Sequence, residues 1–311
     1  MIILTGSIAY DFIVDFPGKF EDSILPTEIH KINLSFIVNN HKRRRGGTAA
    51  NTYYTLSLLN TKSKLFAMVG KDISEFENDY EKIGFLLPDV VKDENELTST
   101  GFAITDKANN QIWGYSYGAA SKSSKLRLSK IAKKGDLVLI GPCGRDGTMG
   151  FTKQCIKLGL DYLFDPSLLL SGLTDEDIAL GIQHAKYFLG NDYEMALMEK
   201  RLGKKWPSLL EGKIIITTLG AKGAKIKSKG KVYTIGIARP KEIVDPTGAG
   251  DAWRGGFLAG VQRGFDLQIC GQMGAVASSF AIECYGTQEH KFTTEQFQER
   301  YRKNFADMLQ L

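Results

Sequence analysis

Short apolar runs, separated by stretches with helical periodicity, constrain the fold of this chain more than any other feature. The runs are KLFAMVG (64–70), DLVLIG (136–141), LDYLFD (160–165), KYFLG (186–190) and KIIITTLG (213–220). Such alternation is typical of a parallel sheet that helices cover on both faces. The N-terminal run MIILTGSIAYDFIVDF (1–16) predicts a first buried strand. We therefore predict an α/β fold with a mostly parallel central sheet.

Two segments have strand periodicity and a polar face, which such a sheet does not explain. KINLSFIV (31–38) places Ile32, Leu34, Phe36 and Val38 on one face, and GFAITDKANNQIWGYSY (101–117) reads as two strands around a turn. Trp113, Tyr115 and Tyr117 share a face of the second of these strands. We expect a small antiparallel sheet inserted into the main fold.

The remaining segments favour one domain over residues 1–311. Residues 265–286 and 293–310 predict two closing helices, and no repeat or Pro/Ser-rich linker separates two units. The basic runs KIKSKGK (225–231) and KSSKLRLSKIAKK (122–134) are typical of the exposed faces of a hairpin and of a helix.

Charge and cysteine usage exclude several classes of function. Lys and Arg number 40 against 35 acids, and this net charge of +5 favours an anionic ligand such as a nucleotide without requiring nucleic acid. The cysteines form no CxxC pair and the histidines no HExxH spacing, so zinc and a disulfide framework are not expected. The N-terminus lacks a basic region and reaches Asp11 early, unlike a signal peptide or a membrane span. We expect a cytoplasmic protein.

The stretch VDPTGAGDAWRGGFLAG (244–260) contains more glycine than a helix tolerates at no cost, since each interior Gly costs about 1 kcal/mol against Ala. These glycines allow the close approach either of a ligand or of another backbone; they are Gly248, Gly250, Gly255, Gly256 and Gly260. A glycine-rich turn that enters a helix also presents unpaired N–H groups to an anion.

Asp251 is unexpected in such an anion pocket. It is either a first-turn acid that caps the helix together with Thr247, or a base aimed at a substrate hydroxyl while the neighbouring amides stabilise a transferred phosphoryl group. Rival phosphate motifs are excluded: GxxxxGK[ST] is absent, and Trp253 stands where GxGxxG needs its third glycine.

DPTGAGDAWRGGF (245–257) resembles the C-terminal signature of the ribokinase-like (pfkB) family of carbohydrate and nucleoside kinases. GGTAAN (46–51), NDYE (191–194) and TLGAKGA (218–224) resemble three further motifs of that family, in the family's order. The resemblance implies a ribokinase-like three-layer sandwich with a small antiparallel β lid. It also implies an anion hole and a catalytic base, formed by Gly248, Ala249, Gly250 and Asp251.

The same resemblance implies a site for ATP and Mg²⁺. Its residues would be Asn191, Glu194, Thr218, Gly220, Gly223 and Thr247. Glu194 would act on the magnesium ion through water, since no dedicated metal cage is visible. Whether potassium is needed and whether the protein is a homodimer are left open.

Residues 4–26, KINLSF (31–36) and YGTQE (285–289) are most similar to bacterial nucleoside kinases of the adenosine kinase type. The lid would then consist of inserts at about 10–45 and 98–118. The implied substrate-binding residues are Ser7, Asp11, Gly46, Gly47, Asn51, Phe102, Tyr115 and Asp251. Among them Asp11 and Asn51 would hold the sugar hydroxyls, and Phe102 and Tyr115 would contact a purine.

One departure from that pattern concerns the base. Relatives carry Gln after the strand that ends near Asp165, whereas this chain has Leu168 and Leu169. Leucine cannot hydrogen-bond a base edge, so discrimination among bases is loosened or relocated. The expected substrates are ATP and adenosine or a broader range of purine nucleosides.

Three alternatives to a nucleoside kinase are considered. A ribokinase-type sugar kinase would share the phosphoryl transfer and lack a base pocket. A non-catalytic ligand-binding relative is disfavoured because Asp251 is present, and a nicotinamide-dependent dehydrogenase is disfavoured because its glycine fingerprint fails.

Overall fold

The main sheet has eight strands in the order β14-β13-β12-β11-β10-β9-β1-β4. The computed structural model describes residues 1–31, 33–39, 41–108, 110–306 and 308–311. The parallel strands are β1 (Ile2–Thr5), β4 (Ser63–Leu65), β9 (Leu137–Ile140), β10 (Asp161–Phe164), β11 (Tyr187–Asn191) and β12 (Ile214–Thr218). At one edge β13 (Ala224–Ser228) and β14 (Lys231–Ile235) pair antiparallel. The predicted mostly parallel sheet is confirmed.

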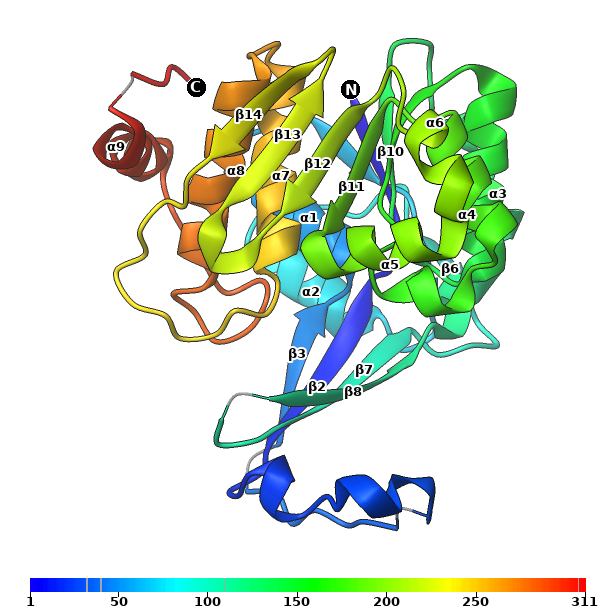
Figure 1. Cartoon of the computed structure of the whole chain (residues 1–311), viewed down its shortest axis with the longest axis vertical. Helices are drawn as coiled ribbons and strands as arrows, with labels where there is room; N and C mark the ends of the chain where they lie inside the picture. Colours follow the sequence, from blue (N-terminus) through cyan, green and yellow to red (C-terminus); the bar gives the residue numbers. More distant parts are fainter. Residues whose placement is uncertain (32, 40, 109, 307) are drawn as a thin grey trace.

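Two cores lie on opposite faces of this sheet, because successive side chains of a strand point to opposite sides. In β9, Leu139 belongs to one core while Val138 and Ile140 belong to the other. The first core contains residues of α1 (Thr48–Leu58), α2 (Ser74–Lys82), α7 (Ala249–Gln262), α8 (Leu267–Ala281) and α9 (Thr294–Phe305). The second contains residues of α3 (Arg145–Leu158), α4 (Asp175–Gln183), α5 (Asp192–Leu202) and α6 (Trp206–Leu209). The result is the three-layer arrangement of Figure 1.

A second sheet projects from this body and forms the lid (Figure 1). Its strand order is β3 (His41–Gly46), β2 (Ala9–Asp15), β7 (Ser99–Thr105) and β8 (Gln111–Ser116). The β2–β3 and β7–β8 pairs are antiparallel, while β2 and β7 run parallel. These strands run from Ala9 to Gly46 and from Ser99 to Ser116, next to the inserts expected at about 10–45 and 98–118. Residues 32, 40 and 109 lie outside the described part.

The strand expected at KINLSFIV is wrong. Ile32 lies outside the described residues, positions 33–39 contain no strand, and the lid strand β3 follows instead. Phe36 packs against Phe16 and Phe20, with ring centroids 4.6 and 5.3 Å apart. Phe36 is partly buried in this aromatic cluster, whereas Leu34 and Val38 are exposed, so the alternating pattern does not mark a half-buried strand here.

Short elements connect these layers. The run 64–70 divides into β4 and β5 (Met68–Gly70), and β5 pairs with β6 (Val91–Asp93). The 3₁₀ helices are η1 (Phe20–Asp22), η2 (Pro26–Lys31), η3 (Gly118–Lys125), η4 (Leu128–Lys130), η5 (Ser167–Gly172), η6 (Gly203–Lys205) and η7 (Gly220–Lys222). The helix face expected at 122–134 is therefore only parts of η3 and η4. No helix in the described part of the chain is long and apolar enough to cross a membrane.

The interior glycines of α7 allow other helices to approach. A Cβ on Gly255 would lie 2.6 Å from the Cβ of Thr55 in α1. On Gly256 it would clash with the Met273 carbonyl oxygen of α8, and on Gly260 it would lie 2.9 Å from the Cα of Cys270. Backbone approach, rather than ligand approach, accounts for these three positions.

Candidate active site

The carboxyl ends of the parallel strands bring polar residues to one edge of the main sheet. Asp165 follows β10, while Asn191 and Thr218 end β11 and β12 and are direct neighbours in register. Helix α7 begins at the same edge, since its Arg254 forms an ion pair with Asp165. Open α/β sheets bind their ligands at this edge.

A cleft of ≈ 440 Å³ lies between the lid and the start of α7. Its lining combines residues predicted from the sequence with others that were not. The lining residues are Asp11, Gly47, Thr48, Asn51, Trp113, Tyr115, Leu168, Thr247, Gly248, Asp251 and Thr287. Lid, body and glycine-rich turn thus contribute to a single cavity.

Asp251 lies in the first turn of α7 with both carboxylate oxygens engaged. Its Oδ2 accepts a hydrogen bond of 2.7 Å from Asn51 Nδ2, and its Oδ1 accepts one of 2.5 Å from a terminal nitrogen of Arg254. Burial raises the pKa of Asp251, while Arg254 and the Asn51 amide oppose that shift. These partners therefore favour the deprotonated form that a base requires.

Arg254 connects Asp251 to the end of β10. Its Nε forms an ion pair with Oδ2 of Asp165, a residue that is 0% exposed. Burial alone lowers the pKa of Arg254, but the carboxylates of Asp165, Asp251 and Glu194 more than offset this and raise it. A permanent positive charge is therefore buried among three acids.

The side-chain amide of Asn51 is held from two sides. Its Oδ1 accepts hydrogen bonds from Thr287 Oγ1 at 2.8 Å and from Gln288 Nε2 at 2.7 Å. Gln288 is in turn held by the hydroxyl of Tyr80, 2.9 Å from its Oε1. With its oxygen saturated, Asn51 can offer a ligand only N–H donors.

Asp11 projects from β2 into the cleft between two glycines on neighbouring strands. A Cβ on Gly46 would clash with its Oδ2, and one on Gly101 would lie 2.5 Å from its Oδ1. Burial, with a smaller contribution from Asp251, raises the pKa of Asp11 to about 7. These two glycines make room for a carboxylate that is 6% exposed.

The turn before α7 is braced by Asp245. Its Oδ1 accepts the N–H of Thr247 at 2.9 Å and its Oδ2 that of Gly286 at 3.0 Å. Gly248 then adopts φ 78°, a left-handed conformation that favours glycine, and Ala249 begins the helix. The amides of Gly248, Ala249 and Gly250 therefore belong to a helix N-terminus, where an anion is stabilised.

The loop after β1 meets the other glycine motif. The N–H of Thr48 donates to the hydroxyl of Ser7 at 3.3 Å, and a Cβ on Gly47 would lie 2.5 Å from the Ser7 carbonyl oxygen. Ser7 is buried, so the structure places it beneath Gly47 rather than among the residues that line the cleft.

Five of the six residues predicted for ATP lie at or just after the ends of β11 and β12, while the sixth, Thr247, lines the cleft before α7. Asn191 Oδ1 accepts the N–H of Glu194 at 2.8 Å, and Glu194 Oε2 accepts the N–H of Asn191 at 2.8 Å. This capping box leaves Glu194 Oε1 for a water or an ion. Gly220 and Gly223 both have positive φ, as the turn from β12 to β13 requires.

The structure places Phe102 away from the cleft, contrary to its expected contact with a base. In β7, Gly101 is paired with both Asp11 and Tyr115, so the next residue points to the opposite face. Phe102 is 55% exposed and stacks on Phe12, with ring centroids 5.4 Å apart. Trp113 and Tyr115 provide the aromatic wall of the cleft.

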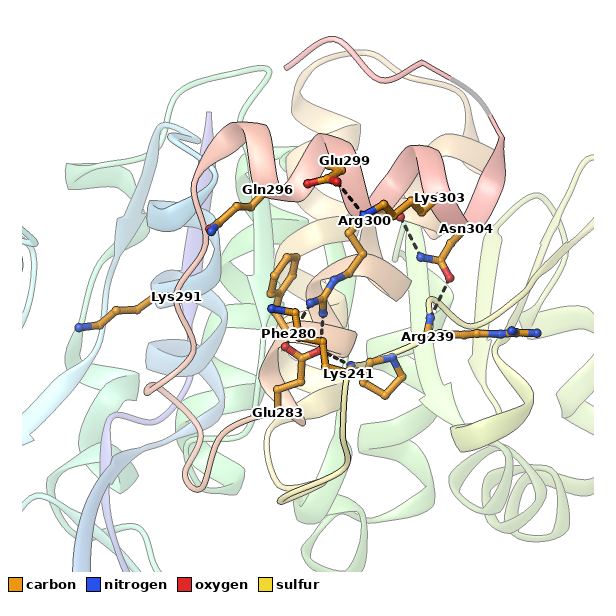
Figure 2. A pocket seen from close by; sticks show the side chains of 11 residues that line it. Arg239, Lys241, Phe280, Glu283, Lys291, Gln296, Glu299, Arg300, Lys303 and Asn304 are labelled. Carbon is orange, nitrogen blue, oxygen red and sulfur yellow. Dashed lines mark hydrogen bonds and ion pairs between the residues drawn. The ribbon is translucent and has the colours of Figure 1, made fainter.

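A larger recess of ≈ 490 Å³ lies beside α9, and Figure 2 shows its lining. Here the N–H of Arg239 donates to Asn304 Oδ1 and that of Lys241 to Glu283 Oε1, which fastens the segment before the glycine-rich turn to the C-terminal helices. The side chains of Lys291 and Arg239 point away from one another (Figure 2). Four charged groups of this recess are paired with one another, Arg300 with Glu283 and Lys303 with Glu299, so it is a weaker candidate than the smaller cleft.

Sequence reasoning gave no role to Thr48 and Thr287, which line the cleft. It also missed Arg254 and Gly101, which lie against the carboxylates of Asp251 and Asp11. The spacing of Arg254 from Asp251, three residues along one helix, was the available signal for an ion pair. Thr287 belongs to YGTQE (285–289), a motif that resembles nucleoside kinases but whose residues were given no role. For Gly101 the signal was only a glycine within a strand.

Comparisons with known proteins agree with this geometry. Residues 18–294 match the pfkB family carbohydrate kinases. A nucleoside kinase of Methanocaldococcus jannaschii is 30% identical over 309 residues, which cover 97% of each chain. The structure of a Burkholderia thailandensis nucleoside kinase with inosine superposes with a TM-score of 0.91 at 29% identity, covering 99% of both chains. Another structure of that enzyme, in complex with ADP-inosine, has a TM-score of 0.89 at 30% identity and covers 99% and 97%.

Proposed function

The chain belongs to the pfkB family of carbohydrate kinases, and from this premise we propose that it is a nucleoside kinase, which transfers the γ-phosphoryl group of ATP to the 5′-hydroxyl of a ribonucleoside. The observation that carries the proposal is the cleft itself. It joins Asp251, at the N-terminus of α7, to Asp11 in the lid and to the aromatic wall of Trp113 and Tyr115.

Asp251 acts as the general base. It accepts the proton of the 5′-hydroxyl while the oxygen of that hydroxyl forms a bond to the γ-phosphorus and the bond to ADP breaks. The amides of Gly248, Ala249 and Gly250 stabilise the charge on the transferred group. Phosphoryl transfer needs both functions at one place, and the first turn of α7 supplies them.

Asp11 and Asn51 hold the ribose. The Asp11 carboxylate can accept from two vicinal hydroxyls, and the Asn51 amide, whose oxygen is already saturated, donates to a ribose oxygen. Since burial raises the pKa of Asp11 to about 7, hydroxyl donors that stabilise its charged form favour binding above that pH.

The base lies between aromatic and apolar walls. Tyr115 and Trp113 supply ring faces, and Leu168, which is 49% exposed, also lines the cleft and has no hydrogen-bonding group. Every purine offers a face for stacking, so the enzyme is lenient about the base and strict about the sugar. The inosine complexes of the Burkholderia enzyme support a purine nucleoside as the ligand.

ATP binds at the ends of β11 and β12, beside Asn191, Thr218, Gly220 and Gly223. The ADP-inosine complex of the Burkholderia enzyme supports this use of a nucleotide. Glu194 fits a role toward Mg²⁺ because its capping box leaves Oε1 available. Glu194 would hold such an ion through water, and the ion would supply positive charge that offsets the negative charge of the phosphates.

An acceptor panel tests the proposal. The purified protein is incubated with MgATP and adenosine, inosine, guanosine, their 2′-deoxy forms, ribose or fructose 6-phosphate, and ADP release is followed. Loss of a 2′-hydroxyl should lower kcat/KM by about 30- to 150-fold, which corresponds to about 2–3 kcal/mol for an unpaired buried partner. Replacing adenosine by inosine or guanosine should cost less.

Two results would contradict this account. One is a sugar that proves a better acceptor than every nucleoside, which would indicate a sugar kinase. The other is selection of adenosine over inosine by about 10⁴-fold, a ratio that requires hydrogen bonds to the base.

The same assay also tests the need for potassium. For this purpose the potassium salts are replaced by tetramethylammonium salts and the rate of ADP release is compared.

A further inference from the structure

Arg254 links two acids that come from different parts of the fold. Its guanidinium forms ion pairs with Asp165, after β10, and with Asp251, three residues earlier on α7. Arg254 is 8% exposed and lies under the glycine-rich turn, where a Cβ on Gly250 would be 3.6 Å from one of its terminal nitrogens. A buried cation with this position can do more than stabilise the fold.

We propose that Arg254 is a positioning residue for the base: it holds Oδ1 of Asp251 and thereby leaves Oδ2 to take the proton of the acceptor hydroxyl, while Asp165 anchors Arg254. The inference rests on the proposed function and deepens it, because it assigns separate roles to the two oxygens of one carboxylate.

The hydrogen bonds support this division. Oδ1 receives a charge-assisted bond of 2.5 Å from a guanidinium, which does not lose its proton in proteins and so never competes as a base. Within the described part of the chain, Oδ2 receives a hydrogen bond only from the neutral amide of Asn51, at 2.7 Å, and both residues line the cleft. An acceptor hydroxyl that enters the cleft therefore meets Oδ2.

Asp165 has a reason to be fully buried in this arrangement. Asp165 pairs with Nε of Arg254 and Asp251 pairs with a terminal nitrogen. Because the guanidinium is planar, these two contacts fix the orientation of its plane. Lysine offers a point charge and cannot hold both partners in this geometry. The position should therefore require arginine and not just a positive charge.

The charged and titratable groups around Asp251 come from several elements. Those that interact with Asp251 are Asp11 of β2, Tyr115 of β8, Asp165 after β10 and Arg254 of α7 itself; Glu194 of α5 interacts with Arg254 and Asp165. Arg254 is the cation among them. Without Arg254, the neighbours of Asp251 would be acids, and its pKa would rise. As the pH is lowered, Asp251 would then become protonated, and unable to act as a base, at a higher pH than in the wild type.

The test compares Arg254→Gln with Arg263→Gln by the pH dependence of kcat. Arg263 is the matched control: it lies at the end of the same helix and donates to Thr61 and to the Leu59 carbonyl, not to a carboxylate. For Arg254→Gln we expect kcat to fall about 10²-fold with KM for both substrates within about threefold, and the acidic limb of the profile to move to higher pH by about one unit. Arg263→Gln should keep the wild-type profile.

Further variants separate positioning from folding. Arg254→Lys should keep the acidic limb near its wild-type position but recover only part of kcat. If Arg254→Gln folds poorly, the double variant Arg254→Gln/Asp165→Asn removes the unpaired buried acid and should recover Tm without recovering kcat. Recovery of kcat together with Tm, or an acidic limb unchanged in Arg254→Gln, would overturn the proposal.

The experiment distinguishes this failure from failure of the proposed function. A wild-type enzyme that phosphorylates no nucleoside contradicts the function, and the profiles are then measured with whichever alcohol releases ADP fastest. A wild-type enzyme that phosphorylates nucleosides, together with an Arg254→Gln variant that behaves like Arg263→Gln, contradicts only the positioning role.

Discussion

Two carboxylates, Asp11 and Asp251, line a cleft that also has to admit a phosphoryl group. The structure balances this charge with groups fixed by the fold: Arg254 beside Asp251, and the helix N-terminus at Gly248. Asp11 instead is buried with its pKa raised to about 7, so that much of its charge is absent near neutral pH until hydroxyl donors bind. The side chains thus divide the work of binding a polar sugar and an anion.

The residues of the cleft differ in how far the sequence reveals them. Asp251, Asp11 and Asn51 stand in motifs, and the structure brings them together. Arg254 escaped notice because a charged residue on an amphipathic helix is ordinarily solvated. Phe102 was expected to face the cleft but lies on the opposite face of β7. The face on which a strand residue lies depends on the register of pairing, and here the partner strand β2 is distant in the chain.

Glu194 provides a prediction at this scale. Glu194→Gln keeps an oxygen for the cap but removes the charge that orients magnesium-bound water, so the Mg²⁺ concentration for half-maximal rate should rise several-fold while KM for the nucleoside changes by less than about twofold. Rates measured across a magnesium titration at fixed ATP check this. Glu199→Gln, an exposed residue of the same helix, is the control. An unchanged titration in Glu194→Gln would remove this residue from the site.

At the scale of elements, α7 has two tasks that its glycines separate. Gly248 and Gly250 lie in the turn that we propose binds an anion, while Gly255, Gly256 and Gly260 let α1 and α8 approach closely. The sequence alone left the choice between ligand and backbone open, because glycine marks close approach without naming the partner. The strands and helices of the body were predictable from their periodicity; β3, a strand of the sequence HKRRRG, was not.

Gly256→Ala tests the packing role. The added methyl group would clash with the Met273 carbonyl of α8, and overpacking of this kind should lower the free energy of unfolding by about 1–3 kcal/mol. Urea denaturation measures the change. Gly236→Ala, where the added Cβ meets nothing within 4 Å, should change it by less than about 0.5 kcal/mol. Equal stability of the two variants would show that α7 and α8 have room to separate.

At the scale of the whole molecule, the main sheet lies between the two cores, and residues of the lid and of the body line the cleft together. Because alternate residues of the same strands enter both cores, we propose that residues 1–311 fold as one domain. The lid is fastened to the body by β3, where Arg43 forms an ion pair with Glu75 at 2.7 Å and Arg45 one with Glu289 at 3.4 Å. The fold class was predictable because alternation of apolar runs and helices admits few architectures. The lid pairing was not, because it depends on contacts between segments far apart in the chain.

His290 makes global stability depend on pH. It is 1% exposed between α1 and Phe292, and burial lowers its pKa from 6.5 to about 4. Between these values the unfolded chain binds a proton that the folded protein does not, so stability falls as the pH falls. By pH 5 its contribution should be a loss of about 2 kcal/mol relative to pH 7.

Urea unfolding of wild type and His290→Gln is measured at pH 7 and at pH 5. The contribution of His290 is the change in the free energy of unfolding between the two pH values in wild type minus the same change in His290→Gln. The exposed His184, at the end of α4, supplies the control variant His184→Gln, which should retain the wild-type pH effect. If His290→Gln loses as much stability on acidification as wild type does, His290 is protonated in the folded protein.

The central claim is that Asp251 is the base of a phosphoryl transfer to a nucleoside, and Asp251→Asn tests it most directly. Steady-state turnover of adenosine and MgATP is measured for wild type and variant, together with ATP binding by calorimetry. We predict that kcat falls by about 10²- to 10⁴-fold, the usual contribution of a general base, while the Kd for ATP changes by less than about threefold. Turnover within a few-fold of wild type would contradict the account.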